Sequence, residues 1–362
     1  MLKGAICMKL EYDLKKLYMD AFAPQTGEKV IFINDFPKEE AKITDGHRHR
    51  AEMTLIWHKV MAELAKELDF DLSPIVTIDL RNPAPGKFDA DAYIDGKPAD
   101  MSKIMDSWGE KDIIIAITGP SITGELLRRL TKQKFRFASA PNVTIDFEGF
   151  KADYSLIPLR FEILTSKMGK AKAAEMIFRY EGQTWKCTFD LRGQRYQYLE
   201  NGSAQRPGEF INLPSGCANI PPYPGIEGDR RGKSQTEGEI PAIINDELVI
   251  YKIKENRIVE ITGEGSAAEN ERKHILDPAH PEMALITKLG LGVNDEGRPN
   301  GTHVGDEKTM GMHWGYGPQK HFPDTIWAEH PIAMDMDFVY PDNSREPIFR
   351  SNFYTRNLGE LF

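Results

Sequence analysis

The sequence predicts an α/β protein with two domains, a Rossmann-like α/β domain over residues 1–150 and a β-rich α+β domain over residues 151–362. A length of 362 residues favours two domains. Uniformly apolar runs alternate with helical patterns in the first part, as in a parallel sheet covered by helices. After about residue 150, short strand-like runs separated by turn residues replace this pattern, which favours an antiparallel second domain.

In the first domain, apolar strand-like runs alternate with segments whose apolar residues recur every three or four positions. Gly119-Pro120-Ser121 follows the last of these runs. Proline there removes a backbone N–H donor, so a phosphate-binding glycine loop is not indicated. The expected helices are Lys9–Phe22, a segment around Met53–Leu64 and Thr123–Lys134, and the expected strands are Lys29–Asp35, Ile75–Asp79 and Asp112–Ile117.

The second domain begins with short strands and contains one clear hairpin signal. Glu255-Asn256 separates two strand-like runs and predicts a tight turn between them. Residues 225–239 are rich in Gly, Ser and charge, which predicts an exposed loop. The expected strands are Met176–Tyr180, Thr184–Leu191, Leu248–Lys254 and Arg257–Ile261.

Composition excludes several classes of function. The 46 basic and 55 acidic residues give a net charge of −9, which disfavours a nucleic-acid partner. The run His47–Arg50 lies at an expected helix start and predicts an exposed face or a subunit contact. No apolar stretch approaches the roughly 18 residues of a membrane span, and the N-terminal run is too short for a signal peptide. Cys7, Cys187 and Cys217 form no CxxC pair, so a reducing cytoplasmic location is expected.

Four blocks in the second half of the chain carry the chemistry. They occur in the order Gly208–Pro222, Ile258–Gly263, Lys288–Asn294 and Asp306–Gly317, and Ala333–Phe338 follows them. In this order the blocks resemble the thermophilic metalloaminopeptidase family, the aminopeptidase T-like enzymes, of which this chain would be a divergent member. That family is related to ring-cleaving dihydroxypyridine dioxygenases. The resemblance implies the two-domain fold, a metal site and a homodimer.

The resemblance places five residues at the metal-ligand positions of the family. Cys217 stands where the P-S-G-E loop has its glutamate, and Lys288 stands where the peptidases have a second glutamate and the dioxygenases a histidine. His313 matches the family histidine, and in the closing H-x-D pair Asp337 is retained while Asp335 replaces the histidine. A protonated Lys288 cannot bind a metal, so a dinuclear aminopeptidase is not expected. The resemblance instead implies one divalent metal, zinc or manganese, held by His313, Asp335, Asp337 and Cys217.

The same positions also permit a metal-free site. Cys217 would then be a nucleophile, and Lys288 would lower the pKa of its thiol or hold an oxyanion. His313 or Asp335 would move protons.

Each of these residues also has a structural interpretation. Cys217 would then be a small buried hydrophobe, His313 a packed core histidine, and Asp335 and Asp337 the polar face of a strand. Glu307 and Lys308 match the family and favour a supporting or turn role over direct ligation. His303, His321 and His330 could replace lost ligands or line a substrate pocket, but an incidental position is more typical of such histidines.

The sequence therefore predicts a hydrolase that acts on the carbonyl of a small polar substrate, such as an amide, a lactam or a cyclic ketone. Catalysis would depend on Cys217, Lys288 and His313, with a single metal or with the thiol alone. The alternatives are a mononuclear iron ring-cleaving dioxygenase and a noncatalytic member of the family. No nucleic-acid or membrane partner is expected.

Overall fold

The computed structural model describes residues 10–81, 88–196, 200–318 and 321–362. Cys7 and the N-terminal run that bears on a signal peptide lie outside these residues. The chain divides into two compact units, one formed by Met1–Ser155 with Gly202–Ser215 and the other by Leu156–Asn201 with Gly216–Phe362. The first unit passes to the second between Ser155 and Leu156, and the segment 202–215 belongs with the first unit.

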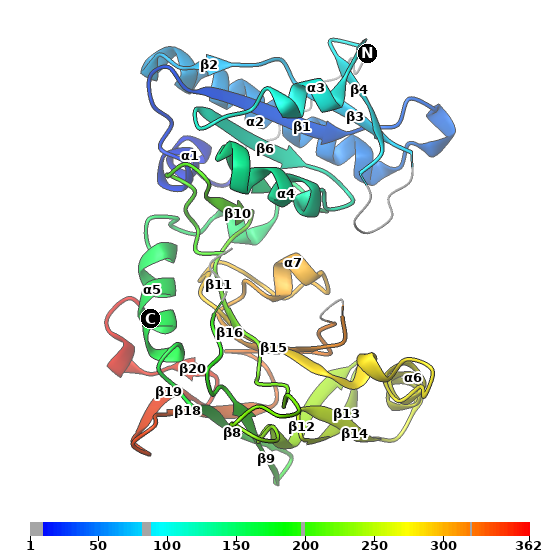
Figure 1. The fold of residues 1–362 in the computed structure, drawn as a ribbon, viewed down its shortest axis with the longest axis vertical. Coiled ribbons are helices and arrows are strands. Elements are labelled where there is room, and N and C mark those ends of the chain that lie inside the picture. The colour runs from blue at the N-terminus through cyan, green and yellow to red at the C-terminus, as the bar shows by residue number, and fades with distance from the viewer. Residues whose placement is uncertain (1–9, 82–87, 197–199, 319–320) are drawn as a thin grey trace. The chain divides into compact units, whose positions relative to one another are not determined.

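The first unit contains a parallel-rich sheet with the strand order β10-β7-β6-β1-β3-β4-β5, in which β2 also pairs with β1 (Figure 1). Strands β10, β7, β6, β1 and β3 run parallel, and β4 and β5 are antiparallel additions at one edge. The strands are β1 (Lys29–Asp35), β2 (Asp71–Leu72), β3 (Val76–Leu80), β4 (Ala90–Ile94), β5 (Lys97–Ala99), β6 (Asp112–Ile117), β7 (Arg136–Ser139) and β10 (Phe210–Asn212). The helices are α1 (Leu14–Ala21), α2 (Asp45–Leu68), α3 (Met101–Asp106) and α4 (Thr123–Gln133).

Helices pack against this sheet as the apolar strands predict. Ile33 of β1 and Ala116 of β6 are fully buried in a core that Trp108 and Leu126 complete. β1 and β6 have the predicted boundaries, because every residue of β6 and all but the first of β1 are buried. The prediction of an exposed face at His47–Arg50 is wrong for Arg50, which is buried and binds Asp35 at the end of β1.

The second unit contains a large antiparallel sheet with the strand order β14-β13-β12-β9-β8-β18-β19-β20 (Figure 1). The expected turn at Glu255-Asn256 joins β13 to β14, and both of its residues adopt the positive φ angles of a tight hairpin. The predicted loop 225–239 is correct up to residue 236, but its last three residues belong to β12, which begins at Glu237. The strands are β8 (Ala173–Tyr180), β9 (Gln183–Asp190), β12 (Glu237–Ile244), β13 (Glu247–Lys254), β14 (Arg257–Thr262), β18 (Ala333–Val339), β19 (Arg345–Arg350) and β20 (Phe353–Tyr354).

A smaller antiparallel sheet in the same unit has the strand order β11-β15-β16-β17. It consists of β11 (Cys217–Ile220), β15 (Ile286–Gly292), β16 (Gly311–Tyr316) and β17 (Thr325–Trp327). The helices of this unit are α5 (Ile157–Met168), α6 (Ser266–Ile275) and α7 (His303–Asp306). The molecule is therefore mixed α/β, with parallel strands in its N-terminal half and antiparallel sheets toward its C-terminus.

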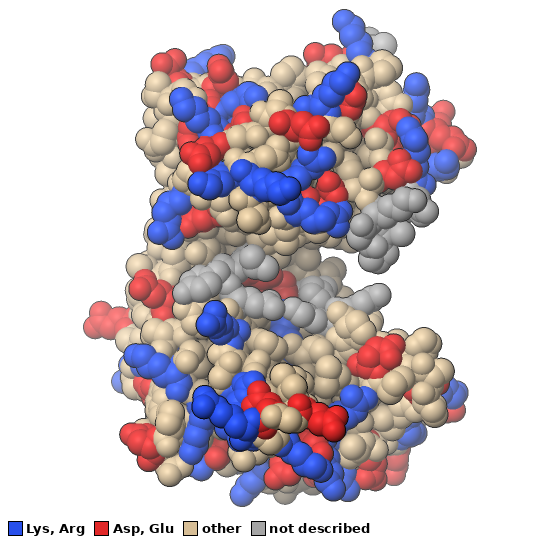
Figure 2. Space-filling model, in the orientation of Figure 1, with Lys and Arg blue, Asp and Glu red and all other residues tan. Residues whose placement is uncertain are grey.

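Acidic and basic side chains are interspersed on the face shown in Figure 2. Among the residues that the structure describes, no helix is long and apolar enough to cross a membrane.

Candidate functional site

Cys217, Lys288 and His313, which are far apart in the sequence, lie on one face of the small sheet. Asn219 on β11 pairs with Gly290 on β15, and Gly290 pairs with His313 on β16. Cys217 is two residues before Asn219, and Lys288 is two residues before Gly290. Because side chains two residues apart on a strand share a face, the sheet brings the three predicted catalytic residues together.

Cys217 and His313 are in direct contact. The Sγ atom of Cys217 lies 3.6 Å from Nε2 of His313, and both residues are 0% exposed. The thiol also lies 3.3 Å from Oδ1 of Asn219, to which it can donate. Burial raises the pKa of the Cys217 thiol, while the nearby charge of Lys288 acts in the opposite direction. The resting thiol is therefore protonated and needs a base to become a nucleophile.

Two lysines and two glutamates form a buried network beside this pair. Nζ of Lys288 lies 2.6 Å from Oε2 of Glu307, and Lys308 also donates to Glu307. Nζ of Lys308 lies 2.5 Å from Oε2 of Glu200. Asn219, which contacts Cys217, donates to Glu200 over 3.4 Å and so links the network to the thiol.

The two lysines are held in their charged form. Burial alone would lower the pKa of Lys288, but the neighbouring acidic groups, with Glu307 the strongest among them, together outweigh burial and raise it. Glu200 and Glu307 raise the pKa of Lys308 in the same way against the effect of burial. The four charges sum to zero, which is how a low-dielectric interior tolerates them.

Glycines on β15 make room for this arrangement. A Cβ atom at Gly290 would overlap the imidazole of His313, and one at Gly292 would overlap the backbone oxygens of Lys308 and Thr309. The G-L-G pattern of this strand therefore lets the histidine and the Lys308 segment lie directly on the sheet.

Four site residues were missed by the sequence interpretation. Phe322 lies edge-on to His313, with 4.9 Å between ring centroids, and the ammonium of Lys288 lies 4.6 Å from the centroid of its ring. Thr325 pairs with His313 across β16 and β17 and is buried. Asn219 could have been found from its position two residues after Cys217, since this spacing shares a strand face. The sequence holds no comparable signal for Glu200, Phe322 or Thr325.

Asp335 and Asp337 lie elsewhere, on β18 of the large sheet. Oδ2 of Asp335 lies 2.9 Å from Nη2 of Arg179, and Oδ1 of Asp337 lies 2.5 Å from Nη2 of Arg350. Arg179 and the backbone N–H of Ser351 bind Asp335 and lower its pKa, although partial burial opposes this. The strand interpretation was correct, but the structure does not bring the two aspartates to Cys217 and His313.

The expected metal set is therefore not assembled. Across residues 10–81, 88–196, 200–318 and 321–362, no group of three or more His, Cys, Asp or Glu side chains could hold a metal ion. Close to Cys217 and His313, the carboxylates of Glu307 and Glu200 are bound by lysine ammonium groups. These donors do not fit the zinc or manganese that the family resemblance implies.

The remaining histidines have local partners. Nε2 of His330 lies 2.9 Å from Asp324, and His321 stacks on Tyr316 and packs against His274. The side chain of His303 lies outside the described part of the structure. Glu307 and Lys308 pair with each other, and they also bind Lys288 and Glu200, respectively.

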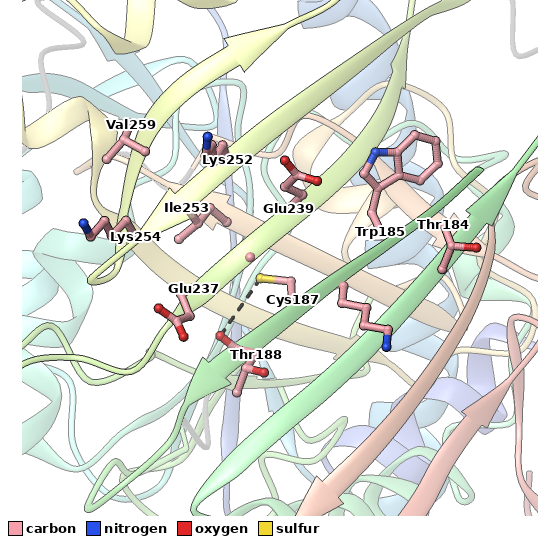
Figure 3. Close-up of a pocket in the computed structure, with 12 residues that line it drawn as sticks. Thr184, Trp185, Cys187, Thr188, Glu237, Glu239, Lys252, Ile253, Lys254 and Val259 are labelled. Atoms are coloured by element: carbon pink, nitrogen blue, oxygen red, sulfur yellow. Dashed lines mark hydrogen bonds between the residues drawn. The ribbon is translucent and has the colours of Figure 1, made fainter.

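A separate pocket of about 600 Å³ lies on the large sheet, between β9, β12, β13 and β14 (Figure 3). Cys187 is among its lining residues, and its Sγ points toward the backbone oxygen of Thr188 at 4.0 Å. Burial raises the pKa of this thiol. None of the described residues that line the pocket is a histidine, so none of them places an imidazole beside Cys187 as His313 lies beside Cys217.

The two units and their sheets define a fold that is shared with known enzymes. The structure matches 2,5-dihydroxypyridine dioxygenase from Pseudomonas putida with a TM-score of 0.60 and 14% identity, over 96% of this chain and 98% of that chain. It also matches wild-type AmpT from Thermus thermophilus with a TM-score of 0.54 and 13% identity, over 94% of this chain and 98% of that chain. No protein-family model and no curated protein sequence matches this chain. The predicted resemblance is thus confirmed at the level of the fold, to an aminopeptidase and a dioxygenase.

Proposed function

We propose that this chain is a hydrolase in which the thiol of Cys217 attacks the carbonyl carbon of a small polar substrate. The observation that carries the proposal is the 3.6 Å contact between Sγ of Cys217 and Nε2 of His313. A thiol beside an imidazole is the arrangement that nucleophilic acyl transfer requires. Lys288, on the same sheet face, adds a fixed positive charge.

His313 would act as the general base because the thiol is protonated at rest. As Sγ attacks, Nε2 takes the thiol proton, a C–S bond forms, and the carbonyl electron pair moves to the oxygen. When an amide or lactam is the substrate, collapse of this intermediate breaks the C–N bond, and the imidazolium gives its proton to the leaving nitrogen. Water then cleaves the thioester with His313 again as base, which releases a carboxylic acid and restores the thiol.

Lys288 would stabilise the negative charge that develops on the carbonyl oxygen. Its ammonium is buried, stays charged because of Glu307, and is fixed by the 2.6 Å ion pair and the face of Phe322. A preorganised charge in a water-poor site stabilises an oxyanion more than the same charge would in water.

The surroundings of the thiol favour a small and uncharged substrate. Cys217 and His313 are fully buried, so a polypeptide chain cannot reach them as it reaches an open protease groove. The lysine and glutamate charges cancel, so the site offers no net charge to attract an ionic substrate. An amide, a lactam or a cyclic ketone meets both conditions.

The test is a screen of the purified protein against neutral amides, lactams and cyclic ketones, followed by variants on any substrate found. We expect Cys217→Ala and His313→Gln each to lower kcat by at least about 10³-fold, because they remove the nucleophile and its base. Cys187→Ala is the matched control, since it removes another buried thiol, and it should leave kcat unchanged. Mass spectrometry of quenched reactions should detect an acyl adduct on Cys217.

Retention of activity by Cys217→Ala would refute the thiol mechanism. Oxygen consumption that depends on added iron would favour a ring-cleaving dioxygenase. A noncatalytic role would be indicated if the protein bound a ligand from the panel without converting it.

A further inference from the structure

The Lys288–Glu307–Lys308–Glu200 network lies beside Cys217 and His313, two of the residues that the family resemblance places at metal-ligand positions. Glu307 accepts from both ammonium groups, as a bridging carboxylate accepts two cations, and Glu200 accepts from Lys308. All four side chains are at least nine-tenths buried. The two ammonium groups together carry the charge of one divalent ion.

We infer that Lys288 and Lys308 replace metal cations in this site and that the protein functions without a bound metal. A divalent ion could reach the carboxylates only by displacing an ammonium group that is already paired. An additional ion placed beside the intact network would find its two carboxylates already paired with ammonium groups, so the neutral network would not offset the cost of removing the ion from water.

The other possible metal ligands near the network do not make metal binding favourable. Cys217 and His313 supply one sulfur and one nitrogen, whereas a structural or catalytic zinc site uses at least three protein ligands. The remaining predicted ligands are Asp335 and Asp337, which lie on the large sheet and bind arginines of that same sheet. Phe322 covers Lys288 with an aromatic face, which favours an organic cation there over a hydrated metal.

This inference concerns the same residues as the proposed function but does not depend on it, because metal binding and thiol catalysis are measured separately. The full-length protein should first be purified without chelators and analysed for zinc, manganese and iron. We expect less than about 0.1 equivalent of each metal, no saturable heat on titration with ZnCl₂ or MnCl₂, and no shift of Tm with EDTA.

Lys288→Gln provides the second arm, because it removes one of the two ammonium groups that pair with Glu307, close to Cys217 and His313. We expect this variant to bind Zn²⁺ at least about tenfold more tightly than the wild-type protein, because the network then carries a net negative charge. Lys252→Gln is the matched control, since Lys252 pairs with Glu260 at the surface and its loss should not change metal affinity.

Stoichiometric metal in the wild-type protein, or a Tm that falls with EDTA, would overturn the inference even if Lys288→Gln failed to fold. Unchanged zinc affinity in a folded Lys288→Gln would also overturn it. A metal-free protein that remains active in the Cys217→Ala form would refute only the proposed thiol mechanism, so the two failures are distinguishable.

Discussion

Gly290 lies opposite His313 in the pairing of β15 with β16, and the imidazole fills the space that a Cβ atom at Gly290 would take. The ring therefore rests directly on the backbone of the neighbouring strand. On the other side of β15, Gly290 pairs with Asn219 of β11, which is two residues from Cys217. The contact between the imidazole and Cys217 therefore depends on the position of the ring over Gly290. One missing side chain thus places the thiol and the imidazole within reach of each other.

Gly290→Ala should separate the thiol from its base. The new Cβ would push the imidazole away, and we expect kcat on any substrate found to fall by about 10²-fold, as for other small displacements of catalytic groups. The free energy of unfolding should fall by about 1–3 kcal/mol because the site is overpacked. Steady-state kinetics and urea unfolding measure the two effects.

Gly124→Ala is the matched control for this change, since nothing lies within 4 Å of a Cβ at that position on α4. It should leave kcat unchanged and slightly stabilise the protein, because alanine favours a helix more than glycine does. Equal activity of Gly290→Ala and the control would show that the position of His313 does not matter for catalysis.

Glu307→Gln should strongly destabilise the second unit. Glu307 is buried and binds both Lys288 and Lys308, so the neutral amide would leave two buried ammonium groups with one carboxylate partner fewer. Loss of one partner of a buried ion pair typically costs about 3–5 kcal/mol. Urea unfolding followed by circular dichroism measures the change.

The exposed pair Lys252–Glu260 provides the comparison for Glu307→Gln. Glu260→Gln removes a carboxylate of the same type at the surface, and its urea midpoint should stay close to that of the wild-type protein because solvent screens such pairs. If the two variants unfolded at the same midpoint, the buried network would not contribute the stability that its geometry suggests.

Much of the fold follows from the sequence because strong local patterns determine it. β1 and β6 are runs of consecutive buried residues, and such runs have few alternatives to a strand inside an α/β layer. The Glu255-Asn256 turn also follows from local chemistry. β15 was not expected as a strand, because K-L-G-L-G weakens strand propensity and its glycines are explained only by the histidine that lies over them.

Residues of the site could be predicted only where the two-residue repeat of a strand, or a position matched to the resembled family, indicated them. Positions shared with the family identified Cys217, Lys288 and His313, which the structure places together. Asp335 and Asp337 have the alternating spacing of two ligands on one strand face, but they bind arginines from other strands. The partner of a charged residue depends on which strands become neighbours, and sequence spacing does not contain this information. Glu200 illustrates the same limit, since it reaches Lys308 across a separation of 108 residues.

Arg50→Lys should loosen the carboxyl end of β1. Nε and Nη2 of Arg50 each donate to Asp35 over 2.8 Å, and lysine cannot reproduce this two-point contact. We expect the free energy of unfolding to fall by about 1–3 kcal/mol, with faster hydrogen exchange in β1 and the first turns of α2. Arg48→Lys, two residues away and exposed, should change neither property.

Alkaline pH should destabilise the protein in part through Cys217. Burial raises the pKa of this thiol above the ordinary value of 9.0, so the thiol stays neutral in the folded state when it would ionise in the unfolded chain. Its contribution to stability is therefore complete below pH 9 and is lost as the pH rises toward the folded pKa. The loss amounts to about 1.4 kcal/mol by pH 10 for one thiol.

Unfolding measured at pH 7, 8, 9 and 10 for the wild-type protein and Cys217→Ala isolates this effect from that of the tyrosines, which both proteins share. The difference in unfolding free energy between the two should be constant from pH 7 to 8 and then shift by about 1.4 kcal/mol in favour of Cys217→Ala by pH 10. Cys187→Ala should show a shift of the same sign, because burial also raises the pKa of that thiol. A difference for Cys217→Ala that stays flat to pH 10 would mean that the folded site accepts a thiolate beside Lys288, and His313 would then not be needed to remove its proton.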